Sequence, residues 1–174
     1  MSRTVIAKPT SRGFSLIEAM IAMFILMIGL LGLAAMFPAG FVAVTGAGKM
    51  TMAVTGSRQI LEDARSVPFT NLINMNGFDT NDASTLPAAQ PERDIARRWR
   101  YALAGEGSGF TFTTTEKSQW RTLATTVGSL NATLGARGRI SVVAQSATLR
   151  LVTITINVPG RTTPVSVATL FSRT

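Results

Sequence analysis

The sequence predicts an α+β protein in which a long N-terminal helix packs against a C-terminal antiparallel sheet. An apolar run without any charged residue extends over residues 19–48. Apolar residues at helical spacing continue beyond it, to about residue 66. Near the C-terminus, three segments rich in β-branched residues alternate apolar and polar positions, as half-buried strands do.

The composition excludes several classes of function. The chain of 174 residues contains neither cysteine nor histidine. The first absence excludes disulfides and thiolate metal sites, and the second removes the commonest general base and zinc ligand. We therefore expect no enzyme, no metal and no cofactor. The net charge of +8 admits a nucleic-acid partner, but three of the cations (Arg3, Lys8 and Arg12) precede Gly13.

Residues 14–44 predict a membrane-spanning helix. About 20 apolar residues suffice to cross the hydrocarbon core of a bilayer. The basic residues before Gly13 place the N-terminus in the cytoplasm and the rest of the chain across the membrane. A cleaved signal peptide or an ordinary single-pass anchor is the alternative, although a signal peptide has an apolar core of only roughly 7–15 residues.

Glu18 stands at the edge of this apolar run. A carboxylate costs about 2.5–3.5 kcal/mol near the bilayer centre and less at its margin. A signal peptide or a plain anchor gains nothing from that cost, whereas a cationic partner would offset much of it. Glu18 is therefore a candidate functional residue.

The stretch R-G-F-S-L-I-E, between a basic leader and an apolar run, resembles the processing site of type IV prepilins and of type II secretion pseudopilins. Gly13, Phe14 and Glu18 match that pattern position by position. The resemblance implies that a prepilin peptidase cuts between Gly13 and Phe14 and methylates the new amino group of Phe14. It also implies that Glu18 pairs with the N-terminal amine of a neighbouring subunit during assembly.

The resemblance further implies a pilin-like organisation in four parts. These are a leader (1–13), a transmembrane and filament-core helix (14–44), an amphipathic extension (45–67) and a soluble β-rich head (68–174). The implied partners are other pilin or pseudopilin subunits, an inner-membrane assembly platform and membrane lipid. The implied location is the bacterial inner membrane and then a periplasmic or cell-surface filament.

Two runs, IGLLGLA and ILEDARSVPF, resemble the minor pilins known as pilus modification proteins. The lack of cysteine is a departure, because many pilin heads close a C-terminal loop with a disulfide. A type II secretion pseudopilin, a DNA-uptake pilin and an unrelated single-pass membrane protein remain as alternatives.

Several local features of the predicted helix can be tested against a structure. Gly29, Gly32 and Pro38 predict a weak point, since proline lacks a backbone donor. Arg58 and Glu62 lie four residues apart and can pair. Pro68 disfavours helix at the residue before it and ends the element.

Residues 70–92 are rich in Asn, Asp, Ser and Pro and predict a solvated loop. Asp79 and Asp82, with Asn76 and Asn81, suggest calcium faintly, but the EF-hand spacing and its terminal glutamate are missing.

An arginine-rich stretch follows the loop. Arg93, Arg97, Arg98 and Arg100 alternate with aromatic residues, a composition that makes them candidate DNA-binding residues. The competing interpretation is a basic edge strand or helix whose aromatic side chains pack inward. The glycines at 105, 107 and 109 do not have phosphate-loop spacing and predict a turn.

The predicted strands cover residues 139–145, 148–158 and 164–171. A shift of the apolar positions between Leu151 and Ile154 suggests a bulge in the middle strand. The late hairpin also resembles the C-terminal sheet of minor pilins and pseudopilins.

Overall fold

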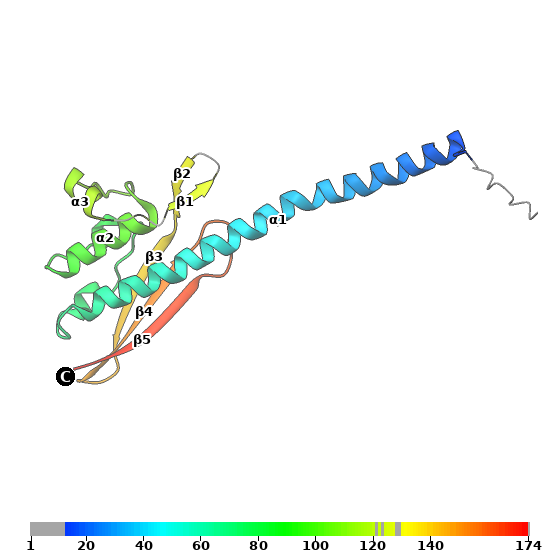
Figure 1. The fold of residues 1–174 in the computed structure, drawn as a ribbon. Helices are drawn as coiled ribbons and strands as arrows, with labels where there is room; N and C mark the ends of the chain where they lie inside the picture. Colours follow the sequence, from blue (N-terminus) through cyan, green and yellow to red (C-terminus); the bar gives the residue numbers. More distant parts are fainter. Residues whose placement is uncertain (1–12, 121, 123, 128–129, 174) are drawn as a thin grey trace, which may run out of the picture. The chain divides into compact units, whose positions relative to one another are not determined.

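A computed structural model describes residues 13–120, 122, 124–127 and 130–173 (Figure 1). The predicted leader up to residue 12 lies outside these residues. The chain divides into two compact units, with the boundary between Val44 and Thr45. The four-part organisation stays a prediction.

Helix α1 (Leu16–Arg65) confirms the predicted long N-terminal helix. It is continuous through Gly29, Gly32 and Pro38, where the sequence predicts a weak point. Every residue from 14 to 44 is exposed. In the second unit the same helix turns amphipathic, and its buried positions are Ala53, Gly56, Ser57, Ile60, Leu61 and Ala64.

The ion pair predicted between Arg58 and Glu62 is wrong. Glu62 instead accepts a hydrogen bond from Arg65, with 2.9 Å between Oε1 and Nη1. A cation on the C-terminal side of a glutamate is the favourable order on a helix. It also places the positive charge in the last turn, where the helix dipole favours it.

The three predicted strands form one antiparallel sheet in the order β3 (Arg137–Ala144), β4 (Leu149–Asn157) and β5 (Val165–Ser172). The pairing of β4 with β5 is unbroken from Leu149 opposite Ser172 to Ile156 opposite Val165, so the predicted bulge is wrong. The apolar pattern shifts because Arg150 occupies a position on the core-facing side of a regular strand. Its guanidinium lies over the Phe69 ring, 4.6 Å from the centroid, and donates to the Phe69 carbonyl.

Between α1 and this sheet, the described residues form the short helices η1 (Leu72–Met75), η2 (Ala83–Thr85), α2 (Glu92–Ala104) and α3 (Thr114–Gln119) and a hairpin of β1 (Ala124–Val127) with β2 (Leu130–Thr133). The arginine-rich stretch is therefore a helix, α2. The turn predicted at the three glycines is confirmed, because Gly105, Gly107 and Gly109 all have positive φ. The backbones of Gly107 and Phe110 bond to each other across it.

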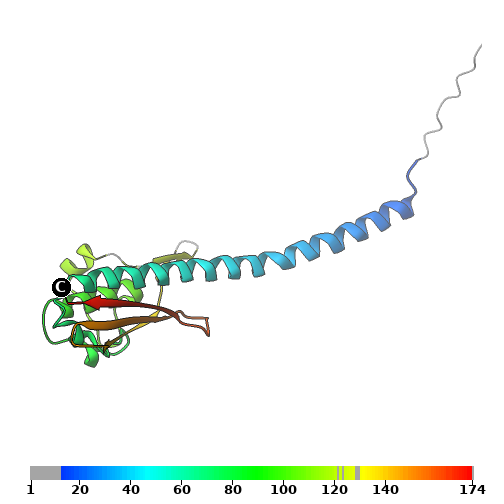
Figure 2. The same ribbon diagram turned by 90° about the horizontal axis from the view of Figure 1, so that it is seen from below.

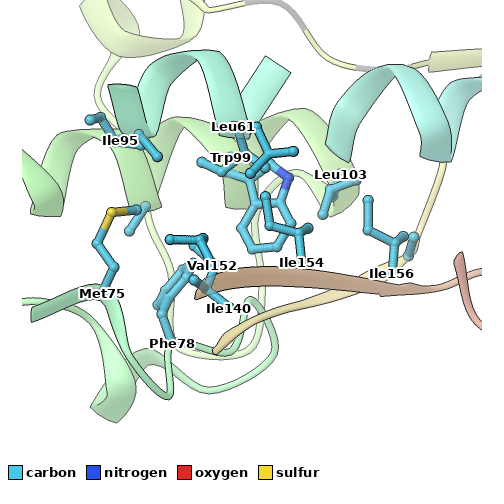
Figure 3. Packing of buried hydrophobic residues seen from close by; sticks show 14 of the residues in the cluster. Leu61, Met75, Phe78, Ile95, Trp99, Leu103, Ile140, Val152, Ile154 and Ile156 are labelled. Carbon is cyan, nitrogen blue, oxygen red and sulfur yellow. The ribbon is translucent and has the colours of Figure 1, made fainter. Parts of the chain in front are cut away.

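The hydrophobic core of the second unit lies between the sheet and the helices, as Figure 3 shows for Leu61 of α1, Trp99 of α2 and Ile154 of β4. Alternate residues of β4 (Val152, Ile154 and Ile156) point into it. The strands can be followed from a second direction in Figure 2. Burial of such side chains is the main stabilising contribution to a head of this size.

Candidate assembly and binding sites

The N-terminal motif lies at the start of α1. Gly13 and Phe14 precede the helix, and the Phe14 side chain is exposed. The Ser15 carbonyl accepts from the backbone N–H groups of Glu18 and Ala19, at 3.0 and 3.1 Å, and so begins the helical ladder. Glu18 is exposed in the first turn, where the helix dipole favours a negative charge. It forms no ion pair with any described residue.

Helix α1 meets the length and composition criteria for crossing a membrane, as no other helix in the described part of the chain does. Its most apolar window has a mean hydropathy of 2.6, and none of that window is buried against the protein. Large side chains such as Phe24, Leu31 and Phe37 are more than half exposed. A surface this apolar requires lipid or other apolar helices around it.

The four candidate DNA-binding arginines have very different surroundings. Arg93 is exposed and forms no ion pair with a described residue, whereas the other three guanidinium groups bind protein groups. Arg97 pairs with Glu116, with 2.8 Å between Nη2 and Oε1, and also donates to the Thr111 carbonyl. Arg98 pairs with Asp63 of α1 at 2.5 Å.

Arg100 is buried, and its guanidinium connects three parts of the head. It donates to the carbonyls of Gly105, Thr80 and Glu106 at 3.0, 2.9 and 3.2 Å. Burial lowers the pKa of Arg100 from its ordinary value. The neighbouring Trp99 is also buried, so this part of α2 packs inward. Of the aromatic residues that suggested base stacking, Trp99 belongs to the core and the half-buried Tyr101 packs against it.

Asp79 is the buried centre of an ion cluster whose two arginines are partly exposed. Its carboxylate accepts from Arg137 Nε at 2.9 Å to each oxygen, from Arg139 Nε at 2.6 Å and from the Asn81 backbone at 2.9 Å. Burial by itself raises the pKa of Asp79, but the hydrogen bonds from the two arginines outweigh it and hold the pKa far below its usual range. The sequence prediction of a solvated loop is wrong here, since Asp79 and Thr80 are buried.

The same segment covers one edge of the sheet. Gly77 N–H donates to the Ile140 carbonyl, Ile140 N–H to the Phe78 carbonyl, and Thr80 N–H to the Gly138 carbonyl. The Asn76 side chain accepts from Val142 N–H at 2.9 Å. An uncovered edge strand can pair with strands of other chains, and this segment prevents that at β3 by bonding to its backbone. The sequence held no local signal for this, because the segment lacks strand periodicity.

A long N-terminal helix together with a three-stranded antiparallel sheet is an α+β arrangement consistent with the pilin-like class of fold. Residues 8–34 match the family model described as the prokaryotic N-terminal methylation motif. The chain thus carries the type IV prepilin-like signature, as the resemblance at Gly13, Phe14 and Glu18 suggested.

This motif supports a type IV pilin-like or pseudopilin protein, and it implies processing by prepilin peptidase and assembly with other pilin subunits. The roles of the individual residues in the matched range stay predictions. The comparison with curated proteins and the comparison with solved structures gave no match.

Proposed function

We propose that the chain is a structural, non-catalytic minor subunit of a type IV pilus or a related filament. It inserts in the inner membrane with its N-terminus in the cytoplasm, is cut between Gly13 and Phe14, is methylated on the new amine and assembles through α1. The observation that carries the proposal is the methylation motif at residues 8–34, placed at the start of an exposed apolar helix.

The apolar surface of α1 supports an assembly step in which helices of neighbouring subunits replace membrane lipid around it. Every residue from 14 to 44 is exposed. Lipid covers such a surface in the membrane, and the equivalent helices of neighbouring subunits can cover it in a filament. Both environments lack water, so either satisfies the apolar side chains at similar free energy.

Glu18 supports the same mechanism through its charge. It is the only charged side chain between residues 13 and 48, so no neighbour on this helix segment can neutralise it. Cleavage after Gly13 creates a new amine on Phe14, close to the start of the apolar run. A carboxylate transferred into an apolar bundle needs such a cation, and a neighbouring chain brings one in the right place.

A type II secretion pseudopilin would share these features, and it is the alternative within the same class. We do not extend the proposal to DNA uptake, because Arg97, Arg98 and Arg100 are engaged with protein groups. The remaining exposed arginine of the four, Arg93, is a single charge.

The test compares Glu18→Ala with Glu62→Ala in cells that assemble type IV pili. We expect the Glu18→Ala chain to be cleaved and retained in the membrane but depleted from filaments sheared off the surface. Glu62→Ala, which changes the net charge equally on the exposed side of the head, should enter filaments normally. Equal amounts of both variants in the sheared fraction would overturn the role given to Glu18.

A further inference from the structure

A polar groove lies on the face of the sheet that points away from the core. It has a volume of about 530 Å³ and is lined by Asp79, Asp82 and the two arginines of β3, together with side chains of β3 and β4. The strand residues in it, such as Ser141, Thr153 and Thr155, alternate with the buried positions and so share the outer face. The groove therefore combines charged groups with a row of hydroxyls.

The carboxylate of Asp79 does not engage all the N–H donors of Arg137 and Arg139. Arg137 donates hydrogen bonds to Asp79 from Nε and Nη2, and Arg139 donates one to it from Nε. The remaining guanidinium N–H groups, on both Nη1 atoms and on Arg139 Nη2, bond to no described residue. The side chains are 44% and 60% exposed. Two guanidinium groups thus share one buried acid and keep donors directed at solvent.

Asp82 is the other acid of the groove, and its carboxylate accepts hydrogen bonds from a residue close to it in the chain. Its Oδ1 accepts from the backbone N–H of Ser84 at 3.0 Å and from the Ser84 hydroxyl at 2.7 Å, which caps η2. These bonds lower the pKa of Asp82, so its negative charge persists beside the arginines. Asp82 therefore weakens the attraction of the groove for anions and supplies a way to test it.

We propose that this groove binds an acidic sugar, whose carboxylate or sulfate group lies against Arg137 and Arg139 while its hydroxyls bond to Ser141, Thr153 and Thr155. Guanidinium groups recognise planar oxyanions through paired N–H donors. A few convergent hydroxyl and amide groups then fix the orientation of a polyhydroxylated ligand. The inference does not depend on the proposed filament role.

The charge pattern favours a sugar over a nucleic acid. A nucleic acid gains its affinity by neutralising many phosphates along a basic track. This groove offers two guanidinium groups, one of them paired twice with Asp79, and it also contains Asp82. One oxyanion surrounded by hydroxyls fits that arrangement.

The experiment measures retention of the full-length chain, in detergent, on immobilised polygalacturonate, on a sulfated dextran and on neutral dextran, at increasing salt. Arg139→Gln is the test variant, because Arg137 still pairs with Asp79 after the change. Arg58→Gln is the matched control, an exposed arginine of α1 whose loss alters the net charge equally. Asp82→Asn removes the opposing acid.

We expect retention on at least one acidic polymer and none on neutral dextran, with the preferred polymer showing whether the oxyanion is a carboxylate or a sulfate. Arg139→Gln should weaken binding about tenfold, the usual effect of losing a hydrogen bond to a charged group. Arg58→Gln should leave binding within about twofold, and Asp82→Asn should strengthen it. Thermal unfolding of each variant verifies the fold.

Four results would overturn the inference. No retention on either acidic polymer at low salt would show that the groove is not a site. Equal losses in Arg139→Gln and Arg58→Gln would reduce the binding to net charge. Weaker retention of Asp82→Asn, or displacement by a short oligonucleotide but not by free galacturonate or a sulfated sugar, would assign the groove to another ligand.

Discussion

The indole of Trp99 fills the space in which a side chain at position 138 would stand. A Cβ built on Gly138 would lie 2.5 Å from Trp99 Cη2 and 2.8 Å from Leu103 Cδ1, closer than real contacts allow. Helix α2 thus rests on β3 at a point where the strand has no side chain. This contact sets how closely α2 approaches the sheet.

Gly138→Ala should therefore destabilise the head by about 1–3 kcal/mol, because overpacking forces a shift of a buried ring. Thermal unfolding followed by circular dichroism measures the change. Gly48→Ala is the control, since a Cβ on that helical glycine meets nothing. An unchanged unfolding midpoint for Gly138→Ala would show that α2 and β3 are not packed this closely.

The Asp79 cluster should make the head sensitive to acid. The pKa of Asp79 is lowered in the folded state, so its contribution is complete above the unfolded value of about 3.9 and is lost as the pH falls below it. Asp79→Asn should cost on the order of 2 kcal/mol near pH 7, with a difference from wild type that shrinks toward pH 2. Unfolding midpoints at a series of pH values test this.

Asp94→Asn serves as the control for that series, because Asp94 is exposed and its carboxylate accepts a hydrogen bond from Gln90 but forms no ion pair with a described residue. Its unfolding free energy should stay within about 0.5 kcal/mol of wild type throughout, since a charge in the first turn of a helix contributes only that much. A constant difference between Asp79→Asn and wild type at every pH would show that the ion pairs with Arg137 and Arg139 do not carry the effect.

Arg100 should matter for stability far more than Arg93. Replacing Arg100 by Met leaves the carbonyls of Thr80 and Gly105 without their donors inside the head, which costs about 1–3 kcal/mol for a buried unsatisfied group. Arg93→Met should change the unfolding free energy by less than about 0.5 kcal/mol. Denaturant titration of both variants compares them, and similar small effects would contradict a structural role for Arg100.

Glu92 is fully buried, and neither carboxylate oxygen has a hydrogen-bond partner among the described residues. An unpaired buried carboxyl group destabilises a protein. Glu92→Met should therefore raise the unfolding midpoint, whereas Glu62→Met at an exposed pair should not. A lower midpoint for Glu92→Met would mean that the carboxyl group has a stabilising partner.

Periodicity predicted the elements whose environment is uniform along their length. The three strands follow from the alternation of more and less buried positions, and the second half of α1 follows from apolar residues at helical spacing. The first half of α1 follows from its apolar composition alone, since every residue from 14 to 44 is exposed. The bulge predicted between Leu151 and Ile154 was wrong, since the pairing of β4 with β5 is unbroken there. Arg150 takes a core-side position there, and its contact with Phe69, far away in the chain, is invisible to a local pattern.

The charged residues could not be placed from the sequence, because their partners are distant in it. Asp79 meets Arg137 and Arg139, and Arg98 meets Asp63, only after the sheet and α2 have packed. Composition alone therefore made α2 resemble a nucleic-acid surface. The motif at Gly13, Phe14 and Glu18 was readable because cleavage and methylation depend on local sequence.

Intact mass of the membrane-purified protein shows whether this chain is a processed prepilin-like subunit. We expect loss of residues 1–13 and the gain of one methyl group on Phe14. A mature terminus near residue 40, or an uncleaved chain from cells with active prepilin peptidase, would contradict it.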